Sequence, residues 1–270
     1  MVSAVWAPGE NGPDRASTAR IRDYWLGGSH HTEADRVLAN QILVCAPHLP
    51  YGVRLQRAFL RRVVRHLVAA GVRQFLDLGS GAPTAGNVHE VARELAPESR
   101  VVYIDVDPVV VAEGRALLAG NDAVGYACAD LRRPDEVLGS EEVRALLCLT
   151  EPVAVLLVDV LHFVPDADDP AELGGAYMDA LCPGSYLAIS HMTEDQGILA
   201  AMAMFSRMYG APLPAMEFRG PDRIAKFCVG LDVIDPGIVS LPLWRPDGAD
   251  PVADRNPEQF CGYGALAHKR

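Results

Sequence analysis

One glycine-rich stretch, residues 77–87, holds the residue types best suited to bind a ligand. Asp77 lies at the end of a short apolar segment, Gly79 and Gly81 follow it, and a helical pattern begins at Asn87. Glycine lets the backbone approach a ligand closely, and the free N–H groups of a helix N-terminus attract polar or anionic groups. The stretch therefore predicts a nucleotide-type site in which these four residues contact the ligand.

Two familiar phosphate-binding loops do not fit this stretch. No Gly-Lys-Ser/Thr sequence follows the glycines, as a P-loop would require. Thr84 stands where the third glycine of a dinucleotide-binding Gly-x-Gly-x-x-Gly would fall, and Pro83 stiffens the turn. An NAD(P)-dependent oxidoreductase is therefore the weaker interpretation, and an ordinary strand-to-helix turn is a further alternative.

Further candidate residues stand where three later apolar segments end. They are Asp105, Val106, Asp107, Asp130, Leu131, Asp159, Val160 and His162. A carboxylate after the second segment can accept two hydrogen bonds from ribose hydroxyls, a role that we assign mainly to Asp105. Asp107 can share this role or cap the helix that Pro108 begins. Asp130 can accept from an adenine amino group while Leu131 packs against the ring, or it can simply stabilise a turn.

The last of these residues are placed to act at the reacting end of a ligand. His162 lies three residues beyond Asp159, just past the fourth apolar segment. An imidazole titrates near neutral pH, so His162 can accept a proton from a hydroxyl or an amine, although it can also be a histidine that only packs. Asp159 can orient that imidazole or bind an amino group, which makes these two the predicted catalytic residues. We expect Val106 and Val160 to contact the ligand beside the acids that precede them.

These side chains need a scaffold that brings the ends of several strands together. From residue 74 onward, apolar segments alternate with helical patterns, and the segments are nearly continuous apolar runs, as in a sheet covered on both faces. The predicted strands are Gln74–Leu78, Arg100–Asp105, Gly125–Ala129, Val153–Val158, Ser185–Ser190, Leu231–Ile234 and Tyr263–Ala267. The predicted helices between them include Asn87–Leu95, Pro108–Leu118, Ser140–Leu147 and Ala171–Leu181. The alternation predicts a doubly wound, Rossmann-like α/β sheet of about seven strands.

The chain divides into three predicted parts. Residues 1–17 are rich in Gly, Pro, Asn and Ser and predict a flexible N-terminus, residues 18–70 predict a helical cap, and residues 71–270 carry the sheet with a helical insertion at about 194–230. The cap contains Arg20, Tyr24 and Gly28 in a polar, aromatic and glycine-rich segment. We expect the cap to fold over the ligand and to exclude water, with these three residues in contact with it.

Composition narrows the range of partners. The net charge of −11 counts against a nucleic-acid partner. The longest clean apolar run, Val153 to Val158, is too short to span a bilayer, and no secretory signal is visible. Six cysteines without a C-x-x-C pair fit reduced thiols, and His30-His31 are interpreted as loop residues rather than metal ligands. We expect a cytoplasmic protein with a small-molecule partner and without a metal or membrane contact; a homodimer is left open.

Taken in order, the motifs resemble those of the class I S-adenosylmethionine (SAM) methyltransferases over about residues 75–190. The matching elements are Asp77-x-Gly79-x-Gly81, Asp105, Asp130-Leu131, Asp159-x-x-His162 and Leu181-x-Pro183-Gly184. The run from Ala19 to Gly28 is also similar to the N-terminal signature of an actinobacterial-type S-adenosyl methyltransferase family, long catalogued as a domain of unknown function. Arg22 and His30-His31 depart from the pattern of that family, so the resemblance assigns them no role.

The resemblance implies a class I fold with an antiparallel last strand, SAM as cofactor, S-adenosylhomocysteine as product and an acceptor that is not identified. Because the methyl donor is a sulfonium, catalysis is chiefly alignment for in-line attack, with a base only where the acceptor is protonated. The Asn/Asp-Pro-Pro-Tyr sequence of base-amino methylation is absent, which favours a small-molecule acceptor. Arg20 is then expected near the methionine carboxylate. A non-catalytic SAM-binding sensor or regulatory protein remains the first alternative.

Overall fold

The computed structural model describes residues 16–82, 86–210, 213, 215–248 and 260–270. Most of the predicted flexible N-terminus, together with Pro83 and Thr84, lies outside these ranges. Among the described residues, no helix has both the length and the apolar character needed to cross a membrane.

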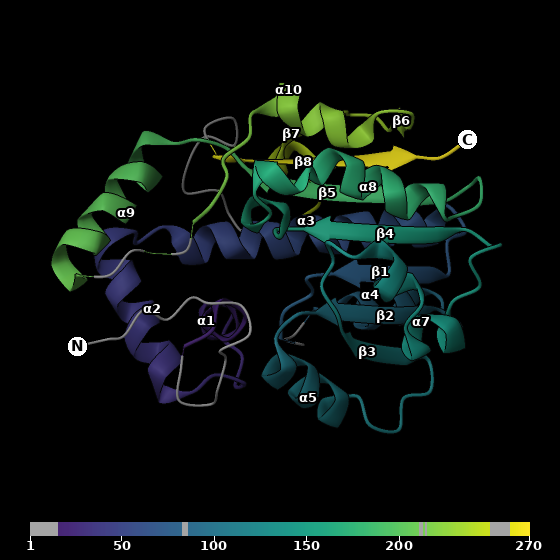
Figure 1. Cartoon of the computed structure of the whole chain (residues 1–270), viewed down its shortest axis with the longest axis horizontal. Coiled ribbons are helices and arrows are strands. Elements are labelled where there is room, and N and C mark those ends of the chain that lie inside the picture. Colours follow the sequence, from purple (N-terminus) through teal and green to yellow (C-terminus); the bar gives the residue numbers. More distant parts are fainter. Residues whose placement is uncertain (1–15, 83–85, 211–212, 214, 249–259) are drawn as a thin grey trace.

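A single mixed sheet of eight strands forms the centre of the molecule, in the order β3-β2-β1-β4-β5-β8-β6 with β7 paired to β8 (Figure 1). The strands are β1 (Gln74–Leu78), β2 (Arg100–Asp105), β3 (Val124–Cys128), β4 (Val153–Val158), β5 (Tyr186–Met192), β6 (Asp232–Val233), β7 (Val239–Ser240) and β8 (Gly262–His268). Neighbouring strands among β1 to β5 pair in parallel, whereas β8 runs antiparallel to β5. The predicted doubly wound sheet with an antiparallel last strand is confirmed. The structure has one strand more than the seven predicted. The additional strand is β7, which has two residues and is too short to give a periodic signal.

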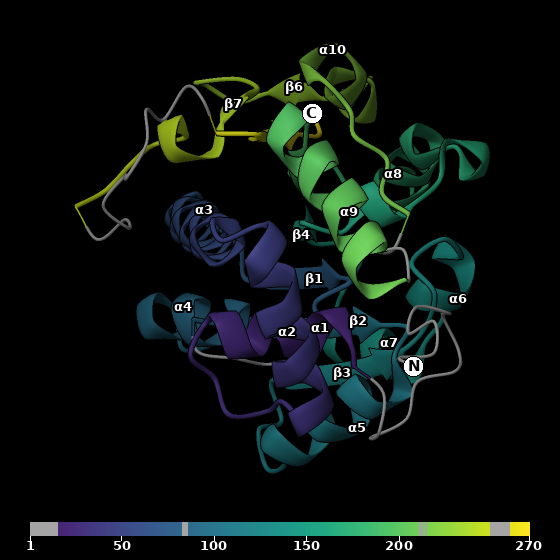
Figure 2. The ribbon, with the colours of Figure 1, turned by 90° about the vertical axis from the view of Figure 1, so that its left-hand side faces the viewer.

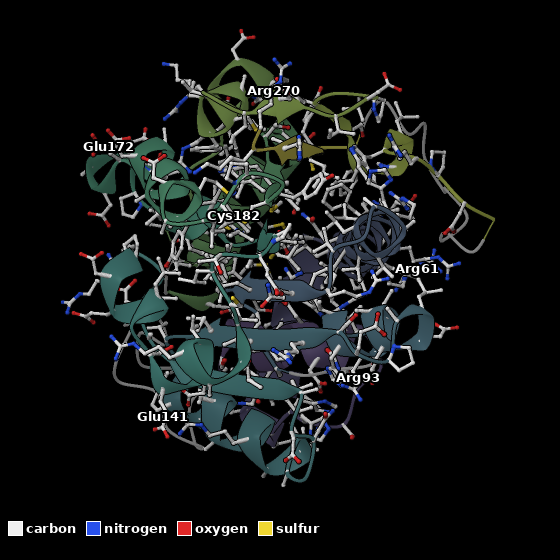
Figure 3. All side chains as sticks on the ribbon, turned by 90° about the vertical axis from the view of Figure 1, so that its right-hand side faces the viewer. Arg61, Arg93, Glu141, Glu172, Cys182 and Arg270 are labelled. Atoms are coloured by element: carbon white, nitrogen blue, oxygen red, sulfur yellow. The ribbon has the colours of Figure 1, made fainter. Side chains whose placement is uncertain are left out.

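Helices cover both faces of the sheet. On one face lie α3 (Leu49–Ala69), α4 (Val88–Leu95) and α5 (Pro108–Leu117). On the other face lie α6 (Pro134–Leu138), α7 (Glu141–Leu146) and α8 (Pro170–Asp179). Figure 3 looks at the edge where the parallel strands begin and separates the two layers, with Arg61 of α3 and Arg93 of α4 on one side and Glu141 and Glu172 on the other. Two apolar cores, one on each face, follow from strands that are buried on both sides.

The N-terminal helices cross the opposite edge, where the parallel strands end (Figure 2). They are α1 (Thr18–Trp25) and α2 (Glu33–Cys45), and the late helix α9 (Gln196–Tyr209) packs against α2. A third apolar cluster joins Ile21, Leu38 and Ile42 of the cap to Phe205 of α9. The helices α1 and α2 therefore lie over this edge, and the division of the chain into a cap and a sheet domain stays a prediction. Helix α3 is grouped with the cap by the sequence analysis, but it packs along the face of the sheet with α4.

Shorter helices complete the chain and shape the loops of the edge. They are the 3-10 turns η1 (Leu161–Phe163), η2 (Asp166–Asp168), η3 (Ala225–Cys228) and η4 (Leu241–Leu243) and the short helix α10 (Pro221–Ile224). Within the predicted helical insertion, residues 221–228 form α10 and η3. The turn η1 matters most for the site because it carries His162 directly after the end of β4.

Candidate functional site

The glycine loop is held in a conformation that favours glycine. Gly79 and Gly81 have φ angles of 69° and 68°, in the left-handed region. The N–H of Gly79 donates to Ile104 O at 2.8 Å, and the N–H of Gly81 donates to Asp105 Oδ2 at 2.9 Å. A Cβ on Gly79 would lie 2.3 Å from Val160 Cγ2, so no larger residue fits there without movement. The loop that the sequence predicts is therefore tied to the end of β2 and lies against Val160.

The end of β2 presents a carboxylate and an apolar surface side by side. Asp105 accepts hydrogen bonds from Gly81 N at 2.9 Å and from Asp107 N at 3.0 Å, which fix the orientation of its carboxylate. Burial raises the pKa of Asp105, and these backbone donors oppose that rise. Val106 is 47% exposed, a large value for an apolar side chain at a strand end. Asp107 caps α5 by accepting from Val109 N at 2.9 Å, which is the structural role considered for it.

Leu131 and Val160 meet over the glycine loop. The Cδ2 atom of Leu131 lies 3.5 Å from the position of a Cβ on Gly79, and the Leu131 carbonyl accepts a hydrogen bond from the Tyr177 hydroxyl at 2.7 Å. Asp130 lies in a turn, where its carboxylate accepts from the guanidinium of Arg132 at 2.7 Å. The predicted contact of Asp130 with an adenine amino group stays a prediction. The structure therefore brings Gly79, Leu131 and Val160 together as neighbours of one surface.

Asp77 and Asn87 flank the loop and are both buried, at 6% exposure each. The N–H of Asn87, at the N-cap position of α4, donates to Glu90 at 2.9 Å. Burial raises the pKa of Asp77 to about 7, while the nearby positive charge of Arg57 lowers it and Asp105 raises it further. Arg57 comes from α3 and also donates to Gly86 O at 3.5 Å. A guanidinium therefore lies beside the glycine loop, in a place that the sequence did not indicate.

The stability of the protein should depend on pH through Asp77. Its pKa is about 7 when folded and 3.8 when exposed, so the folded state keeps the proton longer as pH rises. Stability therefore falls between about pH 4 and 7, and Asp77→Asn should remove that fall, an effect on the order of 2–4 kcal/mol at pH 8. Urea unfolding at several pH values measures the difference; parallel curves for the two proteins would contradict the prediction, and Asp122→Asn is an exposed control.

Contacts from three other elements hold Asp159 at the end of β4. It has a φ of 61°, and its N–H donates to Ser190 Oγ at 2.9 Å. Gln56 Nε2 donates to Asp159 Oδ1 at 2.9 Å, and Ser190 Oγ donates to Gln56 Oε1 at 2.6 Å. Arg22 of α1 forms an ion pair with Asp159 Oδ2. Three elements distant in sequence thus fix one carboxylate at the end of β4.

His162 lies beside Asp159 but is enclosed. It is 2% exposed, and its Nδ1, which lies 3.8 Å from Asp159 Oδ1, has no hydrogen-bond partner among the residues that the structure describes. Burial, together with the positive charges of Arg22 and Arg219, lowers the pKa of His162 well below its ordinary value. A neutral imidazole with a low pKa is a weak base. The structure brings the predicted catalytic pair together, and the assignment of His162 as a base stays a prediction.

A buried arginine fixes the segment that carries His162. Arg219 is 1% exposed and donates to Leu161 O at 2.8 Å, to Val164 O at 2.7 Å and to His191 Nε2 at 2.9 Å. His191 Nδ1 lies 2.7 Å from Met192 O, which can only accept, so Nδ1 carries the proton and the ring is neutral. Arg219 therefore fastens η1 to the end of β5, a role that no sequence pattern indicated.

The predicted cap residues are present, and their contacts are mainly within the cap. Arg20 is 1% exposed and its Nε donates to Asp35 Oδ2 at 2.8 Å. The Tyr24 ring packs edge-on against His31 with 5.0 Å between centroids. A Cβ on Gly28 would lie 2.0 Å from Asp23 Oδ1, which explains the glycine by close packing. Their contacts with a cofactor stay predictions, whereas Arg22 is the residue of α1 that reaches the strand ends.

Only weak signals in the sequence pointed to Arg22, Gln56 and Arg57. Arg22 stood out as a departure from a family pattern, and Gln56 and Arg57 lay within a helix that carries several arginines.

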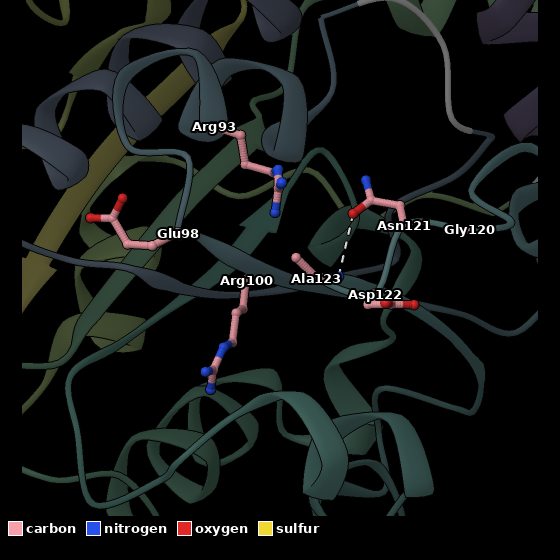
Figure 4. A pocket seen from close by; sticks show the side chains of 7 residues that line it. All are labelled: Arg93, Glu98, Arg100, Gly120, Asn121, Asp122 and Ala123. Atoms are coloured by element: carbon pink, nitrogen blue, oxygen red, sulfur yellow. Dashed lines mark hydrogen bonds between the residues drawn. The ribbon is translucent and has the colours of Figure 1, made fainter.

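In the described residues, no group of three or more His, Cys, Asp or Glu side chains is arranged to hold a metal ion. A hollow of about 570 Å³ exists at the other edge, where β2 and β3 begin, so it is separate from this site (Figure 4). Arg93, Arg100 and Asn121 are among its lining residues.

The strand ends fit a nucleoside that carries an amino-acid group. Asp105 offers an oriented carboxylate for hydroxyl groups, and the exposed Val106 offers an apolar surface for a base. Asp159 and Arg22 offer one charge of each sign at the end of β4. These are chemical groups of the kinds that SAM requires, and their contacts with it stay predictions.

Comparison with known proteins identifies the family of the chain. The model of the S-adenosyl methyltransferase family matches residues 6–270. A DUF574 family protein from Streptomyces avermitilis is 37% identical, with a TM-score of 0.85 over 94% of this chain and 98% of its own. A proposed methyltransferase from Thermobifida fusca is also 37% identical, with a TM-score of 0.84 over 99% of this chain and 100% of its own. The comparison with curated proteins found no match. The chain belongs to the S-adenosyl methyltransferase family, as its motifs predicted.

Proposed function

We propose that the chain transfers the methyl group of SAM to a small-molecule acceptor by in-line attack. The observation that supports this most is the cover over the strand ends, where α1, α2 and α9 share a buried apolar cluster (Figure 2). A small acceptor can enter such a covered edge, whereas a nucleic-acid duplex or a folded protein would require these helices to separate. The net charge of −11 also disfavours a nucleic acid.

Family membership implies SAM as the cofactor, which supplies an electrophilic methyl group on a sulfonium. In this proposal Asp105 binds the ribose hydroxyls, and Val106 and Leu131 contact the adenine. The glycine loop and Asp159 hold the methionine end. These roles follow from the oriented Asp105 carboxylate, the exposed Val106 and the fixed position of Asp159.

Alignment of the acceptor supplies most of the rate in this proposal. His162 is neutral and enclosed, and its lowered pKa makes it a weak proton acceptor. Its imidazole then acts as a wall that orients the acceptor, held in place by Arg219 through η1. A well-aligned nucleophile that has no proton to lose needs no further chemical group, because the sulfur of the sulfonium leaves as a neutral thioether that requires no acid.

The function is tested with methyl-labelled SAM and a cell extract divided by size. We expect label to pass to components of the low-molecular-mass fraction. Transfer to retained macromolecules instead would contradict the small-molecule acceptor. Tight SAM binding without transfer to either fraction would support the alternative of a non-catalytic sensor.

Asp105→Ala is expected to weaken SAM binding by about 1.5–3 kcal/mol, the scale of a hydrogen bond to a charged group. The change removes the acceptor of the Gly81 and Asp107 N–H groups as well as the proposed ribose partner. Calorimetric titration of SAM measures the loss, and label transfer should fall with it at low SAM concentration. Asp122→Ala, at the opposite edge, serves as the control and should bind SAM as the wild type does. Unchanged affinity in folded Asp105→Ala would remove Asp105 from the site.

A further inference from the structure

Helix α1 of the cap contacts two parts of the strand edge, one of them through Arg22. Its guanidinium forms an ion pair with Asp159, and the side chain of Arg22 is 32% exposed whereas that of Asp159 is 5% exposed. Three residues earlier on α1, the Cβ of Ala19 lies 3.7 Å from the position of a Cβ on Gly81. Helix α1 therefore extends from the glycine loop to the end of β4, with Arg22 at the second of these places.

The carboxylate that Arg22 meets is held in a fixed position. Gln56 occupies Asp159 Oδ1, and Ser190 Oγ both accepts from Asp159 N and donates to Gln56. Oδ2 is the oxygen that faces the cap. A ligand cation that replaced or joined the guanidinium at Oδ2 would find its partner already oriented, at little entropic cost.

An α-amino acid group can bind here without leaving a buried charge unpaired. It carries an ammonium and a carboxylate on the same carbon atom. With the ammonium on Asp159 and the carboxylate on Arg22, both side chains remain paired with an opposite charge. This matters because removing one member of a largely buried ion pair costs several kcal/mol.

From this geometry we infer that the α-amino acid end of the cofactor binds between Arg22 and Asp159. Arg22 of the cap helix thereby selects the complete cofactor over its nucleoside part. The inference rests on SAM binding at the strand ends, and it adds a specificity role to a residue outside all the nucleotide-binding motifs. Arg20, two residues away, faces Asp35 instead and has no part in this selection.

The test compares two nucleosides that differ only in the amino-acid arm. S-adenosylhomocysteine carries it, and 5′-methylthioadenosine lacks it. We expect Arg22→Met to weaken binding of S-adenosylhomocysteine by about 10- to 100-fold and to change binding of methylthioadenosine by less than about twofold, both measured by calorimetry. Arg36→Met, an exposed cap arginine paired with Glu33, is the control and should change neither affinity.

The possible outcomes distinguish a failure of the inference about Arg22 from a failure of the proposed function. Equal losses for both nucleosides would show that Arg22 only holds the cap, and no loss for either would remove it from the site. Failure of the wild type to bind S-adenosylhomocysteine would overturn the cofactor itself. Should Arg22→Met not fold, Arg22→Lys keeps the charge but loses the planar fork, and it should still weaken only the nucleoside with the amino-acid arm.

Discussion

Asp35→Ala is expected to lower the free energy of unfolding by about 3–5 kcal/mol, the usual cost of removing one member of a buried ion pair. Asp35 is fully buried, and its carboxylate accepts from Ser17 N at 2.8 Å, from Arg20 Nε at 2.8 Å and from Thr32 N at 2.7 Å. The change takes this carboxylate away from the buried guanidinium of Arg20, and it also removes the capping box at the start of α2. The entry into α1, the turn before α2 and the contact between the two helices all lose their common acceptor.

Urea unfolding followed by tryptophan fluorescence measures this loss, and Trp25 reports on the cap itself. The matched control is Glu33→Ala, two residues earlier in the same helix, where an exposed ion pair with Arg36 contributes well under 1 kcal/mol. Asp35→Asn keeps the shape and loses the charge, so it should fall between the two. A loss as small as that of Glu33→Ala would mean that the apolar cluster alone holds the cap.

Gly79→Ala should abolish tight SAM binding and destabilise the protein by about 2–5 kcal/mol. Two costs combine here: a left-handed φ of 69°, worth about 1–2 kcal/mol for a residue with a Cβ, and overpacking, worth about 1–3 kcal/mol. The added Cβ would lie 2.3 Å from Val160 Cγ2 and 3.5 Å from Leu131 Cδ2. Both neighbours are proposed cofactor contacts, so relief of the clash displaces the surface on which the cofactor lies.

Gly81→Ala separates these two costs. Gly81 has nearly the same φ, 68°, but a Cβ there would meet only Ala19, at an ordinary contact distance of 3.7 Å. It should therefore show the backbone strain without the clash, a loss of about 1–2 kcal/mol. Thermal unfolding and calorimetric titration of SAM measure both variants. Equal effects at the two glycines would mean that backbone conformation, and not contact with Val160, requires Gly79.

Much of the fold followed from the sequence because its signals are local. The strands β1, β2 and β4 begin and end at the predicted residues, since continuous apolar runs bounded by charged or glycine residues mark buried parallel strands. Asp107 before Pro108 predicted a helix start that the structure confirms. Short elements without a periodic pattern, such as β7 and α6, could not be recognised in this way.

The candidate site was predicted only in part, because it combines residues that follow strand ends with supporting residues that lie far from them in the sequence. Residues that follow strand ends could be placed at one edge, since parallel strands bring their carboxyl ends together. The residues that support Asp159 could not be placed from the sequence. Gln56 and Asp159 are 103 positions apart and Gln56 and Ser190 are 134 apart, and only the packing of α3 across the sheet makes them neighbours.

The sequence by itself determined the family, the strand that Asp105 ends, the strands that Asp130 and Asp159 follow, and the glycine loop, because each depends on residue types at short spacing. The tertiary structure alone decided which arginine of α1 meets the site. Side chains two positions apart in a helix point in directions that differ by about 200°, so Arg20 and Arg22 cannot face the same neighbour. Which of them faces Asp159 depends on how the whole helix packs against α2 and the strand ends, and no local pattern encodes that rotation.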